Sequence, residues 1–103
     1  MLRIHVHEKA GVATLRVEGR LAGPWVAELE RCWESVLARL GNQHLIVELD
    51  CLSFVDAQGQ FLLQQMSRGG AELIGRGAQC RHLAEEIRQQ TLVSQRRPLV
   101  ESG

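Results

Sequence analysis

The chain has 103 residues, 45% of them hydrophobic, and its 12 Lys and Arg balance its 12 Asp and Glu. This length is sufficient for one small domain with a single core, and a net charge of zero gives no electrostatic reason to expect binding to nucleic acid or to an anionic membrane. The amino terminus alternates in polarity, unlike a signal peptide, and no apolar run approaches ~18 residues. We therefore expect a cytoplasmic protein without membrane insertion.

The first two predicted elements are strands. Apolar and polar residues alternate over residues 2–7 and again over residues 12–18, which is the period of strands with one wet face. A turn at residues 8–11 separates the two runs. Two antiparallel strands joined by a short loop are the simplest arrangement.

A helix is predicted from Pro24 to Leu40, because Pro is tolerated at the first helical position and the apolar residues that follow share one stripe. That stripe consists of Trp25, Leu29, Trp33, Val36, Leu37 and Leu40. Gly41 and Asn42 are typical residues for its end. Residues 44–50 are nearly continuous in apolar character, which predicts a central strand covered on both faces and paired in parallel after a helical crossover.

The remaining pattern predicts a helix over residues 57–68 closed by Gly69 and Gly70, a short strand over residues 71–75, and a last helix over residues 78–90. The inner stripe of the last helix is Cys80, Leu83, Ala84 and Ile87. The element order is β-β-α-β-α-β-α, an α/β fold with a four-stranded mixed sheet and about three helices packed against it. One domain is expected over residues 1–92, followed by a poorly ordered tail over residues 93–103.

The stretch FVDAQGQ, residues 54–60, stands between a predicted strand and a predicted helix. Asp56 is suited to be the N-cap of that helix, with its carboxylate accepting a hydrogen bond from the backbone N–H of Gln58 or Gly59. The carboxyl end of a central parallel strand is also where open α/β sheets present binding groups. A structural role and a binding role are both compatible with this position.

Several segments of the chain, in their order along the sequence, resemble segments of the STAS family, which is named for sulfate transporters and anti-sigma-factor antagonists. Val17, Gly19 and Leu21 resemble the family's L-x-G-x-L segment. The second matching set is Leu49, Asp50, Phe54, Val55, Asp56 and Gly59, which resembles the apolar strand and the following Asp-Ser-Ser/Thr-Gly-Leu motif, with a shortened loop over residues 51–54. GGAELIGRG resembles the family's fourth strand and its entry into the third helix. The resemblance implies a STAS-like fold over nearly all of the chain up to Gln90.

The resemblance also implies a role in bacterial partner switching, in which the unphosphorylated domain binds an anti-sigma factor that is also a kinase. Phosphorylation of the second Ser or Thr of the motif adds negative charge at the interface and breaks the complex. In this chain that position is Gln58, preceded by Ala57, so phosphorylation is not expected there. Ser53 is the nearest hydroxyl, and its expected role is a hydrogen bond to the turning backbone.

The helix over residues 57–68 is predicted to expose one aromatic side chain. With Gly59, Leu62, Leu63 and Met66 as the inner stripe, Phe61 points outward near Gln64 and Gln65. Aromatic side chains are common anchors of protein interfaces, although Phe61 could instead pack under a neighbouring loop. The predicted partner-binding residues are Leu21, Gly23, Asp56, Ala57, Gln58, Gly59, Phe61 and Gln65.

Catalytic and metal sites are not indicated. The cysteines are Cys32, Cys51 and Cys80, an odd number without a C-x-x-C pair, so reduced thiols are expected. His5 and His7 lie two residues apart on one strand but lack an identifiable third ligand. We expect no enzyme activity and no cofactor.

Three functions are therefore compatible with the sequence. The first is a non-enzymatic regulatory module that binds a protein partner, such as an anti-sigma-factor kinase or another regulatory protein, with a homodimer as a further possibility. The second is a cytoplasmic STAS subunit of a lipid or anion transport system. The third is a small-ligand or nucleotide sensor in which the N–H groups of Gln58 and Gly59 hold an anion.

Overall fold

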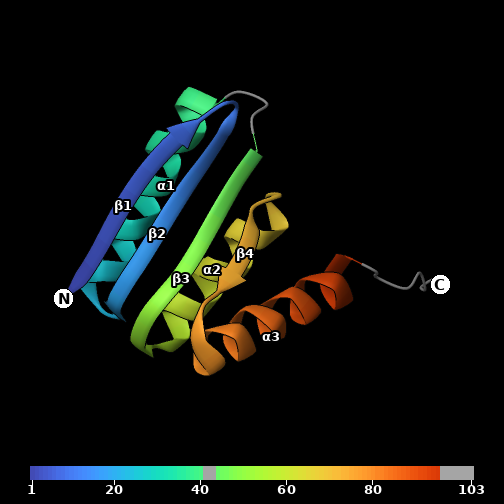
Figure 1. Cartoon of the computed structure of the whole chain (residues 1–103). Helices are drawn as coiled ribbons and strands as arrows, with labels where there is room; N and C mark the ends of the chain where they lie inside the picture. The colour runs from blue at the N-terminus through green and yellow to red at the C-terminus, as the bar shows by residue number, and fades with distance from the viewer. Residues whose placement is uncertain (41–43, 96–103) are drawn as a thin grey trace.

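The computed structural model describes residues 1–40 and 44–95, and over these residues it has the predicted element order (Figure 1). The elements are β1 (Leu2–Lys9), β2 (Val12–Leu21), α1 (Pro24–Leu40), β3 (His44–Val55), α2 (Ala57–Arg68), β4 (Glu72–Gly75) and α3 (Gly77–Gln95). None of the described helices is long and apolar enough to cross a membrane.

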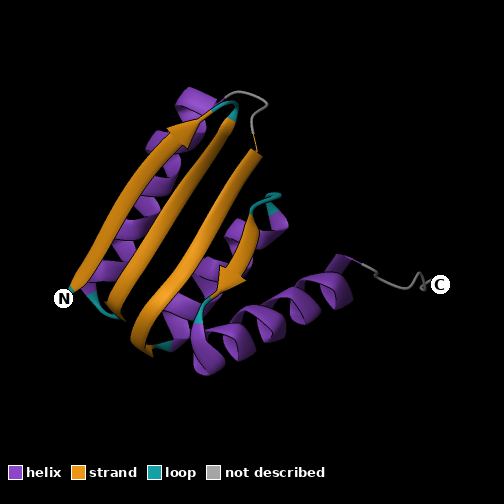
Figure 2. Ribbon diagram, viewed as in Figure 1, coloured by secondary structure: helices purple, strands orange, loops and turns teal. Residues whose placement is uncertain are grey.

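The strands form a four-stranded mixed sheet in the order β1-β2-β3-β4. The β1–β2 pair is antiparallel, whereas β3 pairs in parallel with both β2 and β4. Helices α1 and α2 lie behind the sheet in Figure 2, and α3 packs against α2 at the β4 side. The predicted hairpin, the parallel crossover and the mixed sheet are confirmed.

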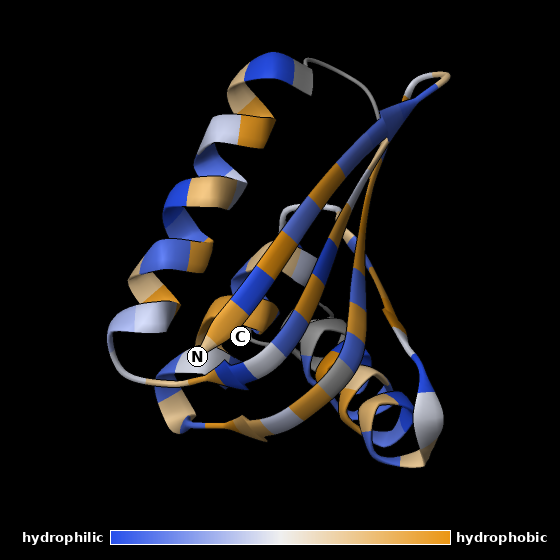
Figure 3. Ribbon diagram, turned by 60° about the vertical axis from the view of Figure 1, so that its left-hand side comes forward, coloured by the Kyte–Doolittle hydropathy of each residue, from blue (hydrophilic) through white to orange (hydrophobic). Residues whose placement is uncertain are grey.

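The core lies between the helices and one face of the sheet. Hydrophobic and hydrophilic residues alternate along the strands (Figure 3), and the core residues of neighbouring strands pair across the sheet. They include Ala13, Leu15, Val17, Leu45, Val47, Leu49 and Leu73, all buried.

The prediction that the strand after α1 is covered on both faces is wrong. Glu48 and Asp50 of β3 lie on the face opposite the core, where Arg16 binds the Asp50 carboxylate at 2.7 Å. The apolar run therefore alternates between core and solvent, because the helices cover a single face. The expected loop over residues 51–54 is also wrong, since β3 continues to Val55 through a register irregularity beside Gly19.

The buried stripe of α1 differs from the predicted one. Leu29 and Val36 are buried as expected, but Val26 is also buried, while Trp25 is 36% and Leu37 44% exposed. These two side chains lie on the flanks of the helix, outside the strip that faces the sheet. The apolar pattern identified the helix but did not fix its rotation.

The inner faces of the two later helices are close to the predictions. The buried residues of α2 are Gly59, Leu62, Leu63 and Met66, and Cys80, Ala84 and Ile87 of α3 are buried with Leu83 packed against them. α3 ends at Gln95 instead of Gln90, so its backbone continues into the predicted tail. The rest of that tail, residues 96–103, lies outside the described residues.

Candidate functional site

Asp56 connects the start of α2 to the loop before α1. Its Oδ1 accepts a hydrogen bond from the Gly59 N–H at 2.7 Å, which confirms the predicted N-cap, and its Oδ2 accepts one from the Gly23 N–H at 3.0 Å. These two N–H groups, Gly59 first, lower the pKa of the Asp56 carboxyl below its ordinary value because they stabilise the charged form. The carboxylate therefore holds together two segments that are 33 residues apart.

The same junction requires glycine at position 59. A Cβ on Gly59 would lie 2.7 Å from the Leu21 carbonyl oxygen and 2.9 Å from the Leu21 Cγ, and that carbonyl also accepts a hydrogen bond from the Asp56 N–H at 3.1 Å. Gly59 thus allows α2 to approach the end of β2 closely. Both Leu21 and Gly59 are buried, so they lie beneath the exposed residues of the predicted set and position them, and their contact with a partner stays a prediction.

The outward side of α2 carries the exposed part of the predicted set. Phe61 is 56% exposed, and Ala57, Gln58 and Gln65 are exposed beside it. A hollow of about 450 Å³ adjoins Phe61 and is lined by these four residues and by Val26, Glu30 and Leu62. We call the exposed lining residues Glu30, Ala57, Gln58, Phe61 and Gln65 the α2 surface.

Val26 and Glu30 are the lining residues that come from α1, and the sequence did not place them at this surface. They lie four residues apart and so share one side of α1, but only the packing of α1 beside α2 brings them to Phe61. Gly23, which was predicted, is exposed at the neighbouring loop and donates to Asp56.

In the STAS family that the sequence resembles, the start of this helix carries a Ser or Thr hydroxyl, whereas residues 57 and 58 of this chain have none. Gln58 and Ala57 are both exposed. Ser53 is exposed too, and its hydroxyl donates to the Gly19 carbonyl at 3.3 Å, which confirms the expected bond to backbone. Next to it, the Arg20 guanidinium stacks 4.8 Å from the centre of the Phe54 ring.

The geometry weighs against an anion held at the start of α2. The Gly59 N–H already donates to Asp56, and the N–H of Gln58 also contributes to the lowered pKa of that carboxyl. The N–H groups that the sensor hypothesis needs to be free are therefore occupied by Asp56. An incoming anion would also be repelled by the negative charge of that carboxylate.

Other titratable groups lie apart from this surface. His5 and His7 line a hollow of about 500 Å³ on the open face of the sheet, together with Val6, Thr14, Arg16 and Glu48. Within residues 1–40 and 44–95, no three His, Cys, Asp or Glu side chains are grouped to hold a metal ion. Cys32 and Cys80 are free thiols, the first half-buried and the second buried.

No protein-family model matches the chain, and no curated protein matches it in sequence. Among solved structures, it is similar to an uncharacterised protein of the DUF3478 family from Shewanella loihica, described as having a SpoIIAA-like fold. The two share 15% sequence identity and a TM-score of 0.53, and the match covers 76% of this chain and 70% of the other. The chain therefore has a SpoIIAA-like fold, which is the STAS-type fold predicted from the sequence.

Proposed function

We propose that this chain is a non-enzymatic STAS-type protein-interaction module that binds a regulatory protein through the α2 surface. The observation that carries the proposal is Phe61, which is 56% exposed beside a hollow between α1 and α2. An exposed aromatic side chain next to a concave apolar floor can anchor a partner, because most interface energy comes from a few such residues.

The chemistry of the α2 surface supports binding without a phosphate switch at the helix start. Gln58 and Gln65 offer amide donors and acceptors, and Glu30 is the charged side chain among the lining residues. Since Ala57 and Gln58 lack hydroxyl groups, a kinase cannot add charge to them. The partner we propose is an anti-sigma-factor kinase or another regulatory protein, bound independently of phosphorylation at residues 57 and 58.

The test compares two substitutions that place the same charge on different exposed apolar positions. The chain is immobilised on a resin and exposed to a lysate of its source cell, and the protein that it captures is identified and purified. The Kd of this partner is then measured for each variant. Phe61→Asp should weaken binding at least tenfold with a nearly unchanged Tm, because a charge replaces the anchor. Leu37→Asp is the matched control, since Leu37 is 44% exposed on α1 and lies outside the α2 surface.

Equal binding by Phe61→Asp and Leu37→Asp would contradict the α2 surface as the docking site. Capture of a permease together with an ATP-binding cassette protein would instead support the transport assembly. Incubation of the complex with its kinase and ATP tests regulation, and phosphate on Ser53 that releases the partner would place a switch in β3 instead of at the start of α2.

A further inference from the structure

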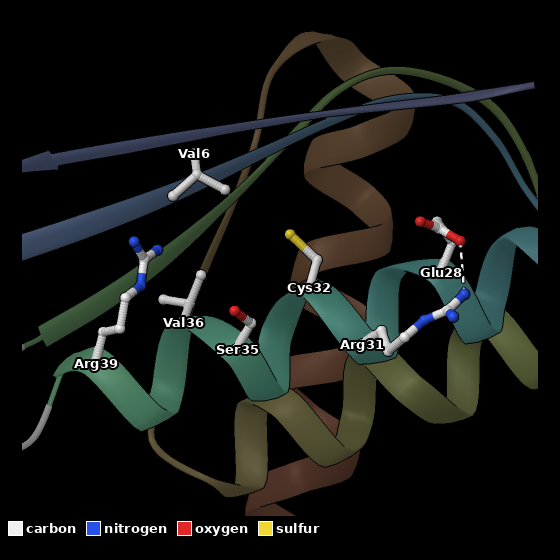
Figure 4. Close-up of a pocket in the computed structure, with 7 residues that line it drawn as sticks. All are labelled: Val6, Glu28, Arg31, Cys32, Ser35, Val36 and Arg39. Carbon is white, nitrogen blue, oxygen red and sulfur yellow. Dashed lines mark hydrogen bonds and ion pairs between the residues drawn. The ribbon is translucent and has the colours of Figure 1, made fainter.

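Strand β1 ends the sheet, and within residues 1–40 and 44–95 no strand pairs with its outer side. A hollow of about 640 Å³ lies between β1 and α1 (Figure 4). Its apolar lining is Val6, Cys32 and Val36, and Figure 4 shows the Val6 and Cys32 side chains facing the gap between the two elements. Val6 is 41% exposed, so α1 leaves this part of β1 uncovered.

The backbone of β1 offers hydrogen-bonding groups along its free side. The Arg20 N–H donates to the Met1 carbonyl at 3.0 Å, and the register then runs without a shift to Lys9 paired with Val12. In an antiparallel pair, bonded and non-bonded residue pairs alternate, so the odd-numbered residues of β1 bond to β2. The N–H and C=O groups of Leu2, Ile4, Val6 and Glu8 therefore point to the free side.

The odd-numbered side chains of β1 share one chemical character. Arg3, His5, His7 and Lys9 are all basic and exposed on the open face of the sheet. No ion pair involves Arg3 or Lys9 in the described part of the chain. A second copy paired along this strand would bring such basic side chains opposite one another, which opposes self-association.

We propose that β1 binds, by strand addition, an extended acidic peptide segment of a partner in which Asp or Glu alternates with apolar residues. The acidic side chains of the added strand would lie on the open face beside Arg3 and Lys9. Its apolar side chains would lie on the other face and enter the hollow over Val6 and Cys32. This strand addition is independent of the α2 surface, and backbone hydrogen bonds supply much of its affinity.

The probe is a labelled nine-residue peptide of alternating Glu and Val with blocked ends, titrated by fluorescence anisotropy at low salt. Two control peptides are used. One alternates Lys with Val, and the other has the same Glu and Val residues arranged as one block of Glu followed by one block of Val. The first peptide should bind saturably and more weakly as salt increases. The double variant Arg3→Glu, Lys9→Glu should bind the Glu and Val peptide about tenfold more weakly and should begin to bind the Lys and Val peptide. The matched double variant Arg68→Glu, Arg81→Glu should leave the affinity for both peptides unchanged.

Substitution Val6→Pro tests the backbone pairing directly, because it removes an N–H that points to the free side and leaves the bonds to β2 in place. It should abolish peptide binding with folding retained by circular dichroism. Amide hydrogen exchange on the unaltered protein gives a second measure: bound peptide should slow exchange at Ile4, Val6 and Glu8 and leave the odd-numbered residues of β1 unchanged.

Unchanged binding by Val6→Pro, or no added protection at these three amides, would overturn strand addition. A dimer in sedimentation that Val6→Pro dissolves would overturn it as well, because a second copy would then occupy the strand. Binding of a uridine oligonucleotide that displaces the peptide and tolerates Val6→Pro would show a basic patch for nucleic acid instead.

Discussion

Asp56 and Gly23 are joined by a hydrogen bond of 3.0 Å from the Gly23 N–H to the Asp56 carboxylate, across a separation of 33 residues. The second oxygen of the same carboxylate caps α2 through the Gly59 N–H at 2.7 Å. One side chain thus satisfies two backbone donors in two segments. The start of α2 and the loop before α1 are therefore expected to loosen together when Asp56 is changed.

Asp56→Ala should lower Tm by about 5 °C, because a helix loses its cap and the Gly23 N–H loses its acceptor. Asp56→Asn should lower Tm less, since Asn remains a good capping residue and its amide oxygen can still accept one of the bonds. Thermal unfolding of the two variants beside the unaltered protein measures this order. A Tm for Asp56→Ala equal to that of the unaltered chain would mean that the two hydrogen bonds contribute nothing to stability.

The pH dependence of unfolding should carry the signature of the same carboxylate. Its pKa in the folded protein is lowered by the N–H groups of Gly59 and Gly23, so the folded state binds the proton less readily than the unfolded state does. The contribution of Asp56 to stability is thus fully present above the ordinary Asp pKa of about 4 and is lost as the pH falls through the lower folded value. Urea unfolding from pH 7 to pH 2 should show a smaller acid-induced loss for Asp56→Asn than for the unaltered chain.

The elements and the inner face of α2 could be predicted because their signals are local. α2 has an Asp before it, two glycines after it, and four inward residues at helical spacing. The face of β3 could not be predicted in the same way. Glu48 and Asp50 read as small interruptions in an apolar run, and only the placement of the helices decides that both side chains lie on an open face.

The residues of the α2 surface could likewise be predicted only where the signal lies within one helix. Phe61 was predicted to be exposed, since it lies opposite the inner stripe of its own helix. Glu30 was not predicted beside it, because the contact between α1 and α2 depends on how two helices pack side by side. Leu21 and Gly59 were assigned to the surface from their place in a motif, and the close approach of β2 to α2 buries both.

Opposite faces of α2 should respond very differently to truncation. Leu63→Ala removes a fully buried side chain and should lower the free energy of unfolding by about 2–5 kcal/mol. Phe61→Ala removes a larger side chain that is 56% exposed and should change it by no more than about 0.5 kcal/mol. Chemical denaturation of both variants tests the assignment, and comparable losses would show that Phe61 belongs to the core.

Gly59→Ala should destabilise the protein although alanine favours helices. The added Cβ would lie 2.7 Å from the Leu21 carbonyl oxygen, and the required shift should cost about 2 kcal/mol, which exceeds the gain of about 1 kcal/mol in helix propensity. Gly69→Ala is the matched control, because its Cβ would meet its nearest neighbours at 3.5 Å and its φ is −76°. If both variants unfold at the same denaturant concentration, the close approach of α2 to β2 is not a constraint on stability.

Cys32 should react slowly with alkylating reagents at neutral pH. Burial first, and then the charge of Glu28, raise the pKa of its thiol, so less of the reactive thiolate is present than in a free cysteine. The rate of iodoacetamide modification, assigned to Cys32 by peptide mass spectrometry, should therefore reach its midpoint at a higher pH than that of glutathione. Glu28→Gln removes one of the two causes and should move the midpoint to lower pH, whereas Glu34→Gln, an exposed change on the same helix, should leave it in place. A midpoint at or below that of glutathione would contradict a pKa raised by the partial burial of this thiol.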